Sequence, residues 1–204
     1  MKKRAALHNL GCKVNAYETE AMRQLLEEDG YEIVPFEPGA DVYVINTCTV
    51  TNIADRKSRQ MLHKARKMNP DAIVVAAGCY VETADGGVEK DPAIDIILGN
   101  NQKNQLVSVI RDFEQKRAGK RAEEPSGAMT KKIDINHTKE YENLIIDRTE
   151  NRTRADIKVQ DGCNQFCTYC IIPFARGRVR SRDTQDVLQE VRALAASGCR
   201  EIVL

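Results

Sequence analysis

The sequence predicts an α/β protein, with an N-terminal doubly wound parallel sheet domain followed by the strand–helix–strand beginning of a barrel. Short apolar runs alternate with segments whose apolar residues recur at helical spacing, which is typical of parallel strands joined by helical crossovers. Close to residue 204, one more strand, helix and strand follow each other. A complete barrel of this type needs roughly 250 residues. We therefore expect the chain to be a truncated piece of a longer protein.

The apolar runs also set the expected order of elements and domains. We expect a first domain over residues 1–110, a linker over 111–150 with a loop at Pro125-Ser126-Gly127, and a second domain that starts at 151. Strands are expected at 5–10, 31–34, 41–45, 72–77, 94–98, 155–160 and 201–204, and helices at 15–30, 52–68, 102–116 and from 184 to Gly198.

Composition and cysteine content narrow the class of protein. Hydrophobic residues make up 42% of the chain and its net charge is +1, so the overall charge neither favours nor excludes nucleic-acid binding. No apolar run approaches the roughly 20 residues of a membrane helix, and the basic N-terminus lacks the apolar stretch of a secretory signal. Seven cysteines, an odd number, argue against a disulfide framework. We expect a cytoplasmic protein with no membrane partner.

Cys163, Cys167 and Cys170 form a C-x3-C-x2-C run. Each thiolate can bind one iron of a 4Fe-4S cluster, so three leave the fourth iron open to a substrate or cofactor. A structural zinc site is the alternative, but the nearest further ligands, His137 and Cys199, stand at unusual spacings. The run therefore predicts an iron–sulfur cluster, and we expect Cys199 to be a core residue.

Cys12, Cys48 and Cys79 each come just after a predicted strand. The loops that follow parallel strands lie along one edge of the sheet, where ligands bind. Three thiolates that converge there would hold a second 4Fe-4S cluster, again with one open iron. The alternative is three ordinary buried cysteines, since free cysteine is among the most buried residue types.

Basic residues suggest two possible contacts with nucleic acid. Arg176, Arg178, Arg180 and Arg182 alternate, so an extended chain would place them on one face as a phosphate-contacting strip; pairing with acidic neighbours is an equal alternative. The helix expected at 52–68 is also basic, and there we favour a solvated face. Its cations are Lys57, Arg59, Lys64, Arg66 and Lys67.

Runs around both cysteine trios resemble the methylthiotransferases of the radical S-adenosylmethionine (radical SAM) superfamily. Gly11 to Asn15 (GCKVN), Asn46 to Val50 (NTCTV) and Gly78-Cys79 resemble their N-terminal domain. Asp161 to Arg182 resembles their radical SAM signature and the segment after it, with Tyr169 in the aromatic position before the third cysteine. The run after Cys170 (IIPFARGR) resembles the branch that acts on N6-threonylcarbamoyladenosine more than the isopentenyladenosine or ribosomal-protein branches.

This resemblance implies an enzyme that adds a methylthio group to C2 of N6-threonylcarbamoyladenosine at position 37 of tRNA. Cys163, Cys167 and Cys170 would hold the SAM-binding cluster, with Tyr169 near SAM. The auxiliary cluster on Cys12, Cys48 and Cys79 would hold or supply the sulfur. One SAM would methylate that sulfur, and a second would give the radical that removes the C2 hydrogen.

Further expectations follow from the same resemblance. The protein would need tRNA and an electron donor, either an unidentified reductase or a flavodoxin-like protein, and the 204-residue chain alone would lack turnover. Two other classes stay open at this point: a two-cluster iron–sulfur electron-transfer protein, and a zinc-dependent module that binds nucleic acid.

Overall fold

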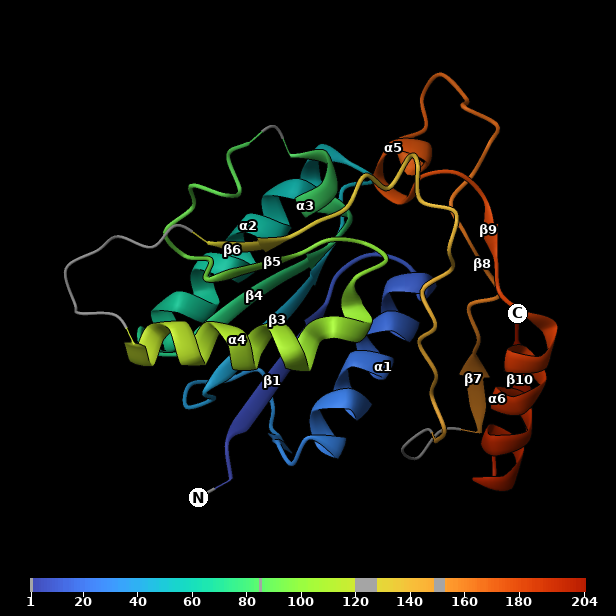
Figure 1. Cartoon of the computed structure of the whole chain (residues 1–204), viewed down its shortest axis with the longest axis horizontal. Helices are drawn as coiled ribbons and strands as arrows, with labels where there is room; N and C mark the ends of the chain where they lie inside the picture. Colours follow the sequence, from blue (N-terminus) through green and yellow to red (C-terminus); the bar gives the residue numbers. More distant parts are fainter. Residues whose placement is uncertain (1, 85, 120–127, 149–152) are drawn as a thin grey trace.

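A parallel sheet with the strand order β2-β1-β3-β4-β5-β6 forms the N-terminal part of the molecule (Figure 1). The computed structural model describes residues 2–84, 86–119, 128–148 and 153–204. Every pairing within this sheet is parallel. Its strands are β1 (Arg4–Asn9), β2 (Glu32–Ile33), β3 (Val42–Thr47), β4 (Ile73–Gly78), β5 (Ile96–Leu98) and β6 (Met129–Lys131).

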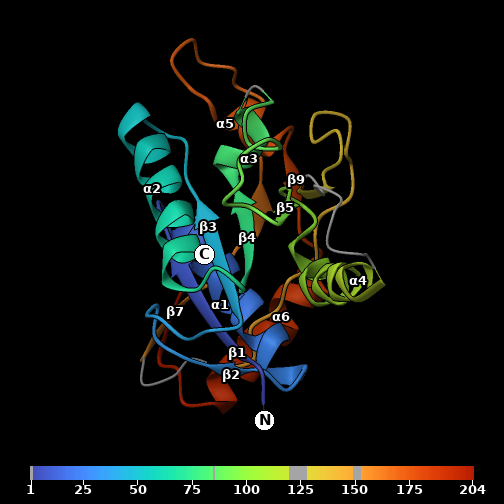
Figure 2. The same ribbon diagram turned by 90° about the vertical axis from the view of Figure 1, so that its left-hand side faces the viewer.

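Helices cover both faces of this sheet, which confirms the doubly wound prediction. Two apolar clusters, one on each face, hold the layers together. Figure 2 shows α2 and α4 on opposite sides of the sheet. One face carries α1 (Lys13–Glu28) and α4 (Leu106–Gly119), which follows the short 3-10 helix η1 (Lys103–Gln105), and the other carries α2 (Asn52–Met68) and α3 (Cys79–Thr83).

The central strands explain why the sequence reads as continuous apolar runs. All residues of β3 and β4 are buried, because each strand has a neighbour on both sides and a helix on both faces. The chain goes from β1 outward to β2 and then returns to β3 on the other side of β1. The edge beyond the carboxyl ends of β1 and β3 is therefore a topological switch point, the usual ligand position in such sheets.

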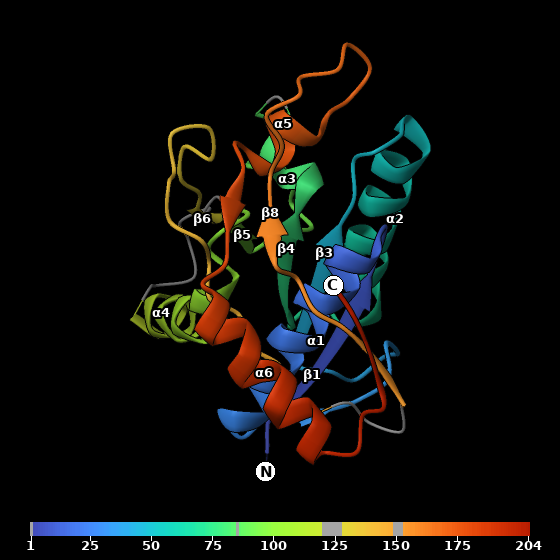
Figure 3. The ribbon, with the colours of Figure 1, turned by 90° about the vertical axis from the view of Figure 1, so that its right-hand side faces the viewer.

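The C-terminal part contains the predicted strand, helix and strand. β7 (Arg154–Asp156) pairs in parallel with β10 (Glu201–Val203), and α6 (Thr184–Ala196) connects them. Between β7 and α6 the chain adds a small antiparallel pair and a short helix (Figure 3). These are β8 (Gln160–Asp161), α5 (Ile172–Arg176) and β9 (Arg180–Ser181).

A third apolar cluster joins this part to the sheet domain through α1. Tyr17 and Ala21 of α1 pack with Leu144 and Ile146, with β7 and with Leu194 of α6. Within the segment expected to be a linker, α4 continues to Gly119 and β6 joins the sheet. Part of the expected linker thus belongs to the sheet. The domain boundaries stay a prediction, and the loop expected at 125–127 lies outside the described residues. None of the described helices has the length and apolar character needed to cross a bilayer.

Candidate metal centres

Cys12, Cys48 and Cys79 all lie at the carboxyl edge of neighbouring parallel strands, as the sequence predicted. Cys12 is the N-cap of α1 after β1, Cys48 directly follows β3, and Cys79 is the first residue of α3 directly after β4. β3 lies between β1 and β4 in the sheet. Cys48 and Cys79 are buried, whereas Cys12 is exposed. The fold thus gathers three thiols at the switch-point edge of the sheet.

Two polar side chains fix the loops that carry the first two of these cysteines. The hydroxyl of Ser58 donates to the carbonyl of Cys48 at 3.0 Å and accepts from its amide at 3.2 Å. The amide of Asn15 donates to the carbonyls of Leu10 at 2.7 Å and Thr47 at 3.0 Å. Asn15 therefore connects the loop after β1 to the loop after β3.

The third cysteine has its own amide neighbour. Nδ2 of Asn100 lies 3.8 Å from Sγ of Cys79 and donates to the carbonyl of Ala175 in α5 at 2.7 Å. Burial raises the pKa of the Cys79 thiol, and the charges of Arg176 and Lys103 oppose that rise. Hydrogen bonds to ligand sulfurs are among the features by which proteins tune iron–sulfur clusters. Asn100 had no role in the sequence-based prediction, because no motif marks it.

Cys163, Cys167 and Cys170 lie in the loop between β8 and α5. The amide of Cys163 donates to the carbonyl of Gly177 at 3.0 Å, which closes the base of the loop. The amide of Cys170 donates to the carbonyl of Cys167 at 2.9 Å in a tight turn. Cys167 is exposed, and the other two cysteines are partly buried. The three thiols therefore lie on a short surface loop that is hydrogen-bonded to the chain after α5.

Aromatic side chains occupy the outer part of the same loop. The guanidinium of Arg178 stacks on the Phe166 ring at 4.2 Å from its centre, and Phe174 meets that ring edge-on at 5.8 Å. Tyr169, the residue expected near SAM, is 90% exposed. Its role toward SAM stays a prediction.

The alternating arginines do not form the phosphate-contacting strip that an extended chain would give. Arg176 ends α5, so it does not share a strand with the others. Arg176, Arg180 and Arg182 are buried, and only Arg178 is exposed. Arg182 pairs with the buried Glu190 of α6. The alternative, pairing with acidic neighbours, is therefore correct for Arg176, which pairs with Glu18 and Asp161, and for Arg182.

The basic face of α2 matches its predicted solvated state, with one exception. Lys57, Arg59, Lys64 and Lys67 are exposed, while Arg66 is partly buried and pairs with Asp95 at 2.5 Å.

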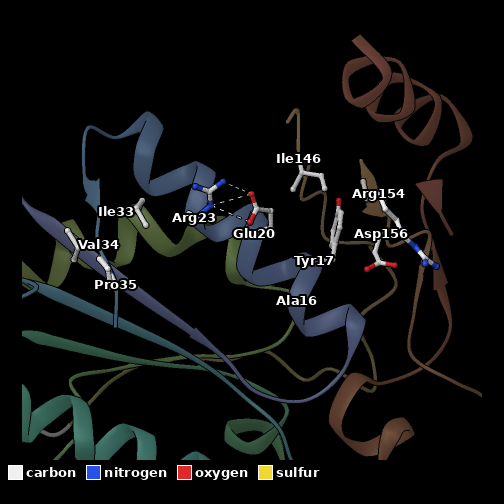
Figure 4. Close-up of a pocket in the computed structure, with 11 residues that line it drawn as sticks. Ala16, Tyr17, Glu20, Arg23, Ile33, Val34, Pro35, Ile146, Arg154 and Asp156 are labelled. Atoms are coloured by element: carbon white, nitrogen blue, oxygen red, sulfur yellow. Dashed lines mark hydrogen bonds and ion pairs between the residues drawn. The ribbon is translucent and has the colours of Figure 1, made fainter. Parts of the chain in front are cut away.

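The cysteine loops lie apart from a groove on the surface of the protein. A groove of about 440 Å³ opens between α1 and β7, and none of the candidate cysteines lines it (Figure 4). Glu20 and Arg23 in this groove hydrogen-bond to each other.

Among the described residues, no three His, Cys, Asp or Glu side chains stand close enough to hold a single metal ion. In a 4Fe-4S cluster, by contrast, each thiolate binds a different iron.

Cys199 lies apart from both trios. It follows α6, and its thiol donates to the backbone carbonyls of Glu201 at 3.2 Å and Thr153 at 3.5 Å. These residues lie at the amino ends of β10 and β7, whereas the Cys163 loop follows the carboxyl end of β7. Cys199 is only partly buried and packs at the edge of the third apolar cluster, so it lies at the margin of the core rather than inside it. The two-cluster electron-transfer alternative would need a fourth ligand, and Cys199 lies at the opposite ends of these strands from the Cys163 loop.

Family models match both halves of the chain. The model described as uncharacterized protein family UPF0004 matches residues 4–99, and that of the Radical SAM superfamily matches residues 157–204.

Curated relatives match almost the whole chain. The threonylcarbamoyladenosine tRNA methylthiotransferases MtaB of Bacillus subtilis and Aquifex aeolicus are 44% and 39% identical over 98% of the chain. A tRNA-2-methylthio-N(6)-dimethylallyladenosine synthase of Carboxydothermus hydrogenoformans is 33% identical over 95%. The alignments cover 42%, 47% and 43% of these relatives. The chain thus spans less than half the length of the relatives it matches.

Among solved structures, the radical S-adenosylmethionine methyltransferase TsrM of Kitasatospora setae, with cobalamin and a [4Fe-4S] cluster bound, has a similar fold. Its TM-score is 0.59 at 16% identity, over 99% of this chain and 47% of TsrM. At this identity the match supports the α/β fold alone.

Proposed function

Because the chain belongs to the radical SAM methylthiotransferase family, we propose that the protein adds a methylthio group to C2 of N6-threonylcarbamoyladenosine at position 37 of tRNA. The names of the relatives at 44% and 39% identity support this substrate. The relative at 33% identity is named for dimethylallyladenosine, so that nucleoside is the second candidate. The observation that carries the proposal is the presence of two separate cysteine trios on neighbouring loops.

The donor sets fit two 4Fe-4S clusters. In each trio the three thiols would bind three of the four irons, which leaves the fourth iron open to a second molecule. In the N-terminal trio, the backbone of Gly11 lies against the side chain of Cys48 and leaves room that a Cβ would fill. We propose that Cys12, Cys48 and Cys79 hold an auxiliary cluster, and that Cys163, Cys167 and Cys170 hold the cluster that binds SAM.

When bound, the clusters and SAM would supply the sulfur, the methyl group and the radical; the chain itself supplies position and environment. α5, which follows the C-terminal trio, packs on α3, which begins at Cys79 (Figure 1). This packing brings the element after one trio against the element that starts at Cys79, and we propose that the open irons of both clusters face one shared cavity. We further propose that Tyr169, at the outside of its loop, contacts SAM, that a reductase or flavodoxin-like protein supplies electrons, and that the protein works in the cytoplasm, where tRNA is modified.

The test is mass spectrometry of tRNA nucleosides from cells that lack the gene. We expect 2-methylthio-N6-threonylcarbamoyladenosine to disappear and N6-threonylcarbamoyladenosine to accumulate. The full-length gene should restore the modification, and so should its Cys199→Ala variant. The variants Cys48→Ala and Cys167→Ala should not restore it. Loss of methylthiolation on isopentenyladenosine instead would move the protein to the other tRNA branch, and unchanged tRNA would contradict the proposal.

A further inference from the structure

We propose that Arg176 is a positioning residue that sets the separation between the two cysteine trios. The inference rests on the proposed function in one respect, because each trio must hold a cluster for their separation to matter. It goes beyond that function by assigning a role to a residue that is neither a cysteine nor part of a cluster loop.

The guanidinium of Arg176 makes close contacts with three partners at once. Its Nη1 lies 2.9 Å from a carboxylate oxygen of Glu18 and 2.9 Å from one of Asp161. Its Nη2 donates to the side-chain oxygen of Asn15 at 2.7 Å. Glu18 and Asn15 belong to α1, whereas Asp161 belongs to β8. One side chain therefore joins the sheet domain to the C-terminal part.

These partners lie next to the loops that carry the candidate cysteine ligands. Asp161 precedes the first cysteine of the C-terminal trio, and Arg176 ends the helix that follows the last one. Asn15 lies in the first turn of the helix that Cys12 caps, 3.9 Å from the Cys12 thiol. Arg176 thus connects both ends of the Cys163–Cys170 loop to the first turn of α1, beside Cys12.

A second connection runs beside the first. Asn100 contacts Cys79 and also donates to the carbonyl of Ala175, the neighbour of Arg176. Lys103 donates to Asn100 at 2.5 Å and pairs with Glu18 at 3.1 Å. The same buried carboxylate of Glu18 therefore anchors both connections.

The geometry needs arginine rather than any cation. A planar guanidinium presents five donors in a fixed fork, while a lysine ammonium is a point charge on a flexible stem. Arg176 and Asp161 are each 4% exposed and Glu18 is 0% exposed, so water has little access to replace a lost contact. A lysine would keep the charge but could not hold all three partners in the same positions.

The experiment measures the magnetic interaction between the two clusters in the anaerobically reconstituted full-length protein. After reduction, two paramagnetic clusters broaden each other's electron paramagnetic resonance signals, and this broadening falls steeply with distance. The variants are Arg176→Lys, which conserves charge, and Asn100→Ala, which removes the second connection without stranding a charge. Arg66→Lys is the matched control, because Arg66 pairs with Asp95 inside the sheet domain and far from this junction.

We expect about eight irons per chain in every protein, the content of two four-iron clusters. The broadening should be lost in Arg176→Lys and Asn100→Ala and retained in Arg66→Lys. Unchanged broadening in Arg176→Lys at about eight irons would overturn the inference, as would its absence from the wild type. Loss of a cluster from Arg176→Lys would also overturn it, because Arg176 would then support cluster binding rather than spacing. Only about four irons in the wild type would instead refute the proposed function itself.

Discussion

Gly11 and Cys48 lie so close that a Cβ on Gly11 would stand 2.7 Å from Sγ of Cys48. Gly11 also has φ of +103°, a backbone conformation that other residues rarely adopt. The residue before Cys12 therefore has to be glycine for two independent reasons. Its missing side chain lets the loop after β1, which carries Cys12, approach Cys48 in the loop after β3.

Replacing this glycine should damage the N-terminal metal centre selectively. We expect Gly11→Ala to lose about four irons per chain, because the added methyl group displaces Cys48. The control is Gly30→Ala, which has φ of +89° and nothing within 4 Å of an added Cβ. It should keep all its iron and lose only about 1–3 kcal/mol of stability through backbone strain. Equal iron contents in the two variants would contradict this role for Gly11.

A second glycine, in the loop of the C-terminal trio, should also tolerate replacement by alanine poorly. Gly162 has φ of +76°, and a Cβ there would collide with the carbonyl oxygen of Arg178. Gly162→Ala should therefore lower the melting temperature more than Gly198→Ala, whose φ is +97° and whose surroundings are open. The control should cost about 1–3 kcal/mol from strain alone. Thermal unfolding of both variants measures the difference, and a smaller effect at Gly162 would show that the loop can move aside.

Glu18 should make stability depend on acid pH. Burial alone would raise the pKa of its carboxyl, but Arg176, Lys103 and Lys158 outweigh burial and hold that pKa well below 4.5, the usual value. The stabilisation from the ionised Glu18 carboxylate is therefore fully present above pH 4.5. It is lost as the pH falls through the lower pKa of the folded state.

Near neutral pH, Glu18→Gln should lower the free energy of unfolding by about 3–5 kcal/mol, because it removes the negative charge that pairs with three buried cations. Urea unfolding should show the gap between wild type and variant narrowing as pH falls below 4.5. Glu37→Gln, at an exposed position, should change stability by less than about 0.5 kcal/mol. A gap that stays constant into acid would mean that the Glu18 carboxyl does not titrate in this way.

The arrangement of the cysteines could be predicted from sequence because it depends on local patterns. Alternating strand and helix signals imply a parallel sheet, and residues just after its strands must share one edge. Cys12, Cys48 and Cys79 obey this rule, so their common edge follows without any knowledge of side-chain contacts. The same patterns indicated the order of the main strands and helices.

The pairing of the buried charges could not be predicted, because it depends on how separate elements pack. Glu18 is 158 residues from Arg176, and Glu190, although only 8 residues from Arg182, lies on the next helix. The spacing of Arg176 and Arg182 is equally compatible with a phosphate-binding strip and with ion pairs. What decides is the packing of α5 and α6 against α1, which buries Glu18 and Glu190 beside them. Asn100 was missed for the same reason, since a lone asparagine after a strand carries no signal until its neighbours are known.

Total iron and sulfide per chain, measured on the anaerobically reconstituted full-length protein, test the two-centre assignment most directly. We predict about eight irons for the wild type and about four after the triple change Cys12→Ala, Cys48→Ala and Cys79→Ala. The triple change Cys163→Ala, Cys167→Ala and Cys170→Ala should leave about four as well. A wild-type protein with about four irons, or with zinc in place of iron, would contradict the assignment.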